Sequence, residues 1–197
     1  MTIALINYPV IFDKAKETVV IVFVAIVIYI LIWTFTKPDN FSKNGGLWIG
    51  FLFIVNISTE DFINWQTKTS TLVSTLTMMF IIFISFSIIS AIKTSRTKII
   101  LKGIKSSFIS ALLGTLIALC FGFLINYLFP DKMVSILKND PGFNEYSNPK
   151  AFTFFNAFDN ASNHVIIAPI VSIIMGALGG AIAVLIWRLK KRKQTTI

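Results

Sequence analysis

Residues 107–129 read SFISALLGTLIALCFGFLINYLF and contain no charged side chain. An α-helix needs about 20 apolar residues to cross the roughly 30 Å hydrocarbon core of a bilayer, so this run predicts a transmembrane helix. Three further runs, 18–36, 71–92 and 165–187, meet the same requirement. We therefore predict an all-α fold, a polytopic integral membrane helix bundle.

The composition supports this class of protein. Hydrophobic residues make up 55% of the 197 residues and charged residues only 14%, whereas soluble domains carry about 25% charged residues. This balance excludes an ordinary soluble enzyme. The 19 Phe residues and the long Ile and Val runs exclude a disordered chain. Residues 1–197 are expected to form a single transmembrane domain.

A fifth run, 46–65, is apolar in its first half and polar in its second half. Its two Trp residues, Trp48 and Trp65, stand 17 positions apart. That separation is about 25 Å of helix, close to the hydrocarbon thickness. Because Trp concentrates at both membrane interfaces, we predict five transmembrane helices. A four-span alternative, in which 46–65 is re-entrant, stays open.

The net charge of +9 is unevenly distributed along the chain. Most of the Lys and Arg residues lie in the loop segment 93–105 and in the basic tail 188–197. The positive-inside rule places both segments in the cytoplasm, with the N-terminus outside and the C-terminus inside the plasma (inner) membrane of the cell. The charge thus reflects orientation and gives no reason to expect nucleic acid as a partner. Anionic lipid contacts are expected from Lys98, Lys102, Lys105, Arg188, Lys190, Lys191, Arg192 and Lys193.

The long connection 131–164 is expected outside, as an amphipathic segment. The apolar stripe of 131–140 predicts a short helix on the membrane surface. Asn148 as N-cap and Pro149 at the first helical position predict the start of a second amphipathic helix. This helix is expected to run into the last span, with a kink at Pro169. Its apolar face comprises Ala151, Phe154, Phe155 and Phe158.

Small residues recur at every fourth position in two of the predicted spans. In lipid, helices associate where small side chains let their backbones approach. We expect the two stripes to pack against each other within one chain, and homo-oligomerisation through one stripe is the alternative. The stripes are Ser106, Ser110, Gly114, Ala118 and Gly122 in the first helix and Ala168, Ser172, Gly176 and Gly180 in the second.

Polar side chains gather near the predicted outer end of the bundle. Asn56, Glu60 and Asn64 recur at every fourth position and so share one helical face. Glu60 would lie about 7 Å inside the interface, and an ionisable group at that depth is a functional-site hypothesis. Alternatively, Glu60 and Asp61 reach the headgroups and the nearby hydroxyl groups only bridge helices. The candidate outer polar cluster comprises Asn56, Glu60, Asp61, Asn64, Ser70, Ser74, Asp159 and His164.

Three functional hypotheses follow. A small transporter or channel-type protein, or a subunit of one, would take a cation or small polar solute at the outer cluster. A non-catalytic interaction or accessory protein would instead assemble, with itself or in a larger membrane complex, through small-residue packing. The third hypothesis, a lipid-modifying intramembrane enzyme, lacks any catalytic motif. One histidine, His164, and one cysteine, Cys120, give no recognisable metal site, so neither a metal nor a cofactor is expected.

Overall fold

The computed structural model describes residues 1–62, 68–138, 140 and 142–195, and within them the side chains other than those at 3, 12–14, 60–62, 68–71 and 193–195. This described part of the chain is helical apart from short connections and contains no strand, which confirms the all-α prediction. The elements are α1 (Thr2–Asn7), α2 (Val10–Thr36), α3 (Asn40–Phe62), α4 (Lys68–Thr97), α5 (Ile100–Leu128), α6 (Pro130–Leu137), a 3-10 turn η1 (Phe143–Glu145) and α7 (Pro149–Thr195).

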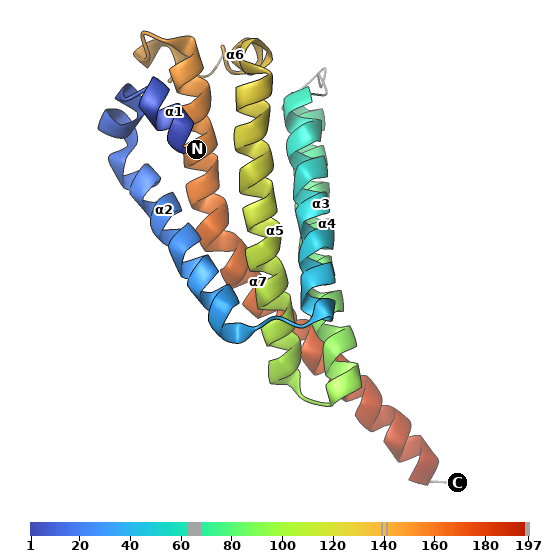
Figure 1. The fold of residues 1–197 in the computed structure, drawn as a ribbon. Helices are drawn as coiled ribbons and strands as arrows, with labels where there is room; N and C mark the ends of the chain where they lie inside the picture. The colour runs from blue at the N-terminus through green and yellow to red at the C-terminus, as the bar shows by residue number, and fades with distance from the viewer. Residues whose placement is uncertain (63–67, 139, 141, 196–197) are drawn as a thin grey trace.

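The long helices α2, α3, α4, α5 and α7 lie side by side in one bundle (Figure 1). Four of them are long and apolar enough to cross a membrane: α4, α5, α7 and the part of α2 that follows a non-helical residue at Ala15. The N-terminus and α6 lie at one end of the bundle (Figure 1). The α2–α3 and α4–α5 connections lie toward the other end, and the C-terminal part of α7 extends beyond it. This is the architecture of a multi-pass membrane protein.

Helix α3 is the segment for which the sequence left two alternatives. It is one unbroken helix from Asn40 to Phe62, and its 23 residues correspond to about 34 Å. A re-entrant loop would reverse direction inside the bundle, and the described part of 46–65 does not. However, α3 is not among the four helices whose length and apolar composition, over their described residues, suffice to cross a membrane.

Helix α5 is the centre of the bundle. Of its apolar stretch, 56% is buried against other helices, compared with 22% of the stretches in α2 and α4. Its neighbours are α3, α4 and α7. In lipid, such contacts gain no hydrophobic free energy and depend on close packing and hydrogen bonds. The faces that α5 presents to its neighbours therefore decide how the helices are arranged.

As the sequence predicted, α5 packs against α7 within one chain, but it does so with another face, and its small-residue stripe packs against α3. The Ser110 hydroxyl donates to the Ser42 carbonyl over 2.9 Å, and the Ser42 and Ser106 hydroxyls lie 2.8 Å apart. A Cβ added to Gly114 would lie 2.5 Å from a methyl group of Ile49. The prediction missed that α3 carries a matching stripe at the same spacing, made of Ser42, Gly46 and Gly50.

The small residues of α7 are covered by α4 and by another face of α5. The Ser107 hydroxyl of α5 lies 3.1 Å from the Ser172 carbonyl. The closest approach is at Gly179, where an added Cβ would lie 2.0 Å from the Ser87 carbonyl oxygen of α4. The Ser87 hydroxyl in turn donates to the Met175 carbonyl over 2.9 Å. The α7 residues buried in this way are Ser172, Gly176, Gly179 and Gly180.

Helix α7 continues through Pro169, where the sequence predicted a kink. Proline has no N–H, so the carbonyl of Val165, four residues earlier, loses its donor within the helix. The Tyr29 hydroxyl of α2 donates to this carbonyl over 2.5 Å, and both residues are buried. The bond satisfies the backbone oxygen that the proline leaves unpaired and fixes α2 to α7.

The predicted start of α7 is confirmed. The backbone N–H of Lys150 donates to the Asn148 side chain over 3.0 Å, as expected for an N-cap. The apolar face that follows is buried at Ala151, Phe154 and Phe158. Residues 149–164 are not a separate surface helix, because they are the first turns of α7 itself. Helix α6 corresponds to the short helix predicted in 131–140.

Most of the basic segment 93–105, which the sequence suggested was a loop, is helical. Helix α4 runs to Thr97 and α5 begins at Ile100, so the connection consists of Lys98 and Ile99. Lys98 has a φ of 59° in the left-handed region, which lets the chain turn within two residues. The basic side chains of this segment therefore lie mainly on two adjoining helix ends.

We expect Gly179→Ala to lower the free energy of unfolding by about 1–3 kcal/mol, because the new methyl group meets a backbone carbonyl that cannot yield. Gly122→Ala is the matched control, since no atom lies within 4 Å of a Cβ added there and alanine is the better helix former by about 1 kcal/mol. Thermal unfolding of the two purified variants in detergent measures the difference. Equal midpoints would contradict the close α4–α7 approach.

We expect Tyr29→Phe to cost about 1–3 kcal/mol, because it leaves the buried Val165 carbonyl without a donor. In a Pro169→Ala background, residue 169 regains its N–H and can bond to that carbonyl. The same substitution should then cost clearly less. A double-mutant cycle of thermal unfolding tests this coupling, and an identical loss in both backgrounds would refute it.

Candidate functional site

Four helices, α3, α5, α6 and α7, surround a cavity of about 130 Å³. A cavity of this size has room for several water molecules or one small solute. Met133 and Leu137 of α6 lie against it, so it belongs to the α6 end of the bundle. We call it the polar cavity, because its lining includes Asn56, Thr115, Asn126, Asn156, Asn160 and His164.

The α5 side of the polar cavity is a single helical face. Asn126 follows Thr115 by eleven residues, which is about three turns and about 16 Å along the helix. Gly122 lies between them, and a Cβ added there would meet nothing within 4 Å. The missing side chain leaves this space open. The α5 side of the polar cavity therefore extends from the α6 end toward the middle of α5.

The α7 side holds a connected set of polar groups. The Asn160 side chain donates to the Asn156 side chain over 2.9 Å, and His164 Nδ1 lies 2.7 Å from the Asn160 carbonyl. Because a carbonyl only accepts, Nδ1 carries the proton, and in the neutral ring Nε2 can accept a hydrogen bond. The ring of His164 also packs edge-on against Phe53, with 5.7 Å between centroids. Asn160 is exposed, so the polar cavity opens beside it.

Two oxygens at the polar cavity are buried without a hydrogen-bond partner among the described residues, Thr115 Oγ1 and Asn126 Oδ1. The amide nitrogen of Asn126 is satisfied by the Gly122 carbonyl at 2.9 Å. Thr97, by contrast, bonds to the carbonyl four residues earlier, as helical hydroxyls commonly do. A buried unsatisfied polar group costs about 1–3 kcal/mol. These two oxygens therefore favour an occupant that donates hydrogen bonds.

The structure brings part of the predicted outer polar cluster to this site. Asn56 and His164 line the polar cavity. Asp159 is exposed on α7 and Ser74 is half-buried on α4, and neither lines it. Outside the described part of the chain lie the side chains of Glu60, Asp61 and Ser70 and the whole of Asn64.

Thr115 and Asn126 were not predicted from the sequence as site residues. A signal existed, because polar residues inside an apolar span are functional candidates and these two share one helical face with Gly122. That face was interpreted only as a packing stripe. Ala118 on the same stripe is buried among apolar side chains, as predicted for packing, but Gly122 packs against nothing.

The residues predicted to contact anionic lipid separate into distinct places. Lys102 and Lys105 line a pocket at the basic end of the bundle. Lys98 and Lys191 lie over the ring of Trp187, at 5.6 and 5.8 Å from its centroid. The last turns of α7 extend beyond the other helices (Figure 1). These turns carry Arg188, Lys190, Lys191, Arg192 and Lys193.

Comparison of the chain with known protein families, curated proteins and solved structures gives no match. The function is therefore inferred from the chemistry of the polar cavity. Its described lining offers amide, hydroxyl and imidazole groups and no carboxylate. Groups of this kind, set among apolar side chains, orient a small polar molecule by hydrogen bonds.

We expect Thr115→Val to raise the free energy of unfolding by about 1 kcal/mol or more, because it removes an unpaired buried hydroxyl at nearly constant volume. Thr153→Val is the matched control. Thr153 is equally buried, but its hydroxyl donates to the Lys150 carbonyl over 2.9 Å, so its loss should not stabilise the protein. Denaturation in detergent compares the two, and a destabilised Thr115→Val variant would contradict the assignment.

Proposed function

We propose that this protein is a small transporter or channel-type membrane protein that takes an uncharged polar solute into the polar cavity. The observation that carries the proposal is the pair of buried oxygens of Thr115 and Asn126, which have no hydrogen-bond partner in the described part of the chain and lie beside open space. The exterior of the same bundle is apolar: Ile28, Leu76 and Ile174 are each about half exposed. A polar interior within a lipid-facing exterior is the arrangement that a solute pathway requires.

The lining favours a neutral solute over an ion. A charge moved into a buried site without an opposite charge carries a large desolvation penalty. No Asp, Glu, Lys or Arg side chain lines the polar cavity among the described residues. Amide groups both donate and accept hydrogen bonds, which suits molecules such as small polyols and amides. The cation expected from the sequence depended on Glu60, whose side chain lies outside the described residues.

The proposed topology has five crossings, with the N-terminus outside and the C-terminus in the cytoplasm of a cell whose plasma membrane holds the protein. Support comes from α3, which packs along α5 and is unbroken over its described length. Further support comes from the basic helix ends, which gather opposite the α6 end of the bundle and are expected inside. In this orientation the polar cavity belongs to the outer half of the protein.

Assembly through small-residue packing is the alternative function. It would need a small-residue stripe on the outside of the bundle. Apart from Gly122, which borders the polar cavity, the described glycines of the stripes of α3, α5 and α7 instead face helices of the same chain. We therefore place solute passage ahead of an accessory role.

The proposal is tested by light scattering of proteoliposomes under osmotic gradients of glycerol and urea. Thr115→Val and Asn126→Leu should each lower the solute permeability about tenfold, the equivalent of one lost hydrogen bond of about 1.4 kcal/mol. Thr77→Val is the matched control, because Thr77 is exposed on α4 and bonds to the Val73 carbonyl of its own helix. This control should keep the wild-type permeability.

Two outcomes would overturn the proposal. A solute permeability equal to that of protein-free vesicles would mean that the protein does not conduct these neutral solutes. Potassium flux that falls in the same two variants, with no flux of neutral solutes, would assign the polar cavity to a cation instead.

A further inference from the structure

A second pocket, of about 280 Å³, lies at the end of the bundle opposite the polar cavity. It is formed where the α2–α3 connection meets the adjoining ends of α4 and α5. Four lysines line it together with one carboxylate, that of Asp39. We call it the basic pocket, and its lysines are Lys37, Lys93, Lys102 and Lys105.

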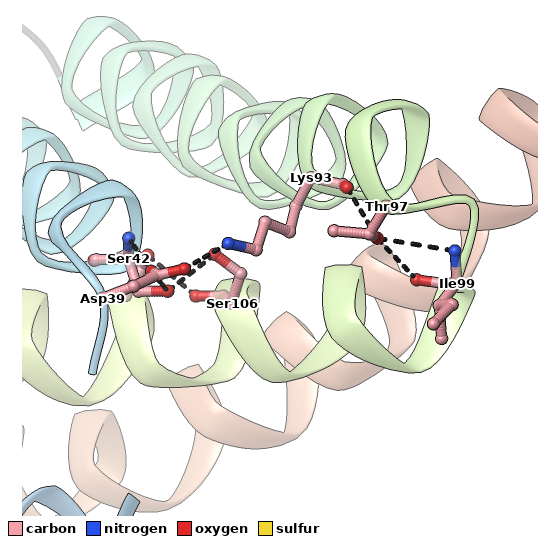
Figure 2. A network of polar contacts seen from close by, with 7 residues as sticks. Asp39, Ser42, Lys93, Thr97, Ile99 and Ser106 are labelled. Carbon is pink, nitrogen blue, oxygen red and sulfur yellow. Dashed lines mark hydrogen bonds and ion pairs between the residues drawn. The ribbon is translucent and has the colours of Figure 1, made fainter. Parts of the chain in front are cut away.

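Both oxygens of this carboxylate accept hydrogen bonds from neighbouring residues. Lys93 of α4 donates to one oxygen of Asp39, and the backbone N–H and hydroxyl of Ser42 donate to the other over 2.9 and 2.7 Å. Figure 2 shows these contacts, with Ser106 of α5 beside Ser42. Burial opposes ionisation of Asp39, but the hydrogen bonds from Lys93 and Ser42 and the charge of Lys93 lower its pKa to about 2. At neutral pH Asp39 is therefore ionised and balances Lys93.

The other three lysines have no ion-pair partner among the described residues. Lys37, Lys102 and Lys105 are exposed, yet all three line the same pocket. Lys37 has a φ of 44° and ends α2, so the chain turns there to bring this lysine toward α5. The basic pocket thus holds an excess of positive charge, with hydroxyl groups of Thr36 and Thr97 beside it.

Two strongly exposed apolar side chains stand close in the sequence to lysines of the basic pocket. Phe35 is 82% exposed and Leu101 is 72% exposed, and each lies within two residues of a pocket lysine in the sequence. Such side chains belong in hydrocarbon, whereas the lysines belong at headgroup level. A ligand that is anionic at one end and apolar at the other matches both.

We propose that the basic pocket binds the phosphate headgroup of an anionic phospholipid. The acyl chains of this lipid would lie against the exposed apolar residues of α2 and α5. Pockets of basic residues between transmembrane helices on the cytoplasmic side are suited to such headgroups. This site is more specific than the diffuse attraction expected from the sequence. It unites Lys37 and Lys93 with Lys102 and Lys105 and leaves out Lys98 and the basic tail. It also stands apart from the proposed solute passage, which uses the other end of the bundle.

The test is native mass spectrometry of the full-length protein in detergent, titrated with phosphatidylglycerol or with phosphatidylcholine. Each pocket lysine should contribute about fivefold to affinity, the equivalent of about 1 kcal/mol per charge. The triple variant Lys37→Gln, Lys102→Gln, Lys105→Gln should bind phosphatidylglycerol about a hundredfold more weakly than the wild type does. The matched control, Arg188→Gln, Lys190→Gln, Lys191→Gln, removes the same charge from the end of α7 and should bind as the wild type does.

Several outcomes would overturn the proposal. Equal losses of phosphatidylglycerol affinity in the two triple variants would mean a diffuse charge effect. Equal affinity of the wild type for phosphatidylcholine would mean that the pocket does not select an anionic headgroup. Displacement of phosphatidylglycerol by millimolar inorganic phosphate would make a free anion the ligand. If the pocket triple variant does not fold, the single variants Lys102→Gln and Lys105→Gln at exposed positions replace it, and unchanged binding in both would count against the site.

Discussion

The arrangement of this protein depends on how closely its helices can approach α5. In a bilayer, helices gain no hydrophobic free energy by touching each other, so packing and hydrogen bonds must hold them together. Ser107 illustrates this constraint, because its buried hydroxyl lies 3.2 Å from the Phe86 carbonyl of α4 and 3.1 Å from the Ser172 carbonyl of α7. One small side chain thus links three helices.

The same constraint explains why the two halves of the bundle differ. Toward the basic end, glycines lie directly against the neighbouring helix, as Gly45 does against Ser110 and Gly179 against Ser87, and the α3–α5 and α4–α7 backbones come close together. Toward the α6 end, Gly122 has no packing partner, and large aromatic side chains such as Phe123, Phe154 and Phe158 separate α2, α5 and α7. The polar cavity lies in this wider half. Packing is therefore closest where the proposed lipid site lies and looser where the proposed solute site lies.

The helices, and part of the polar cavity, could be predicted from the sequence. The N-cap at Asn148 and the buried face that follows it depend on residues within a few turns, and both are confirmed. Asn56 and His164 were candidates because both belong to the polar residues expected at the outer end of the bundle, and both line the polar cavity. Thr115 and Asn126 were missed because the sequence does not reveal whether a helical face meets another helix or an open space.

The sequence by itself determined the apolar helices and the concentration of positive charge at one end of the bundle, because hydropathy and charge are properties of each segment. Only the tertiary structure decided which faces pair. At least three stripes share the same four-residue spacing, in α3, α5 and α7, so periodicity could not assign the α5 stripe to Ser42, Gly46 and Gly50. That choice depends on distances between residues far apart in the chain. The same distances decide where the cavities remain.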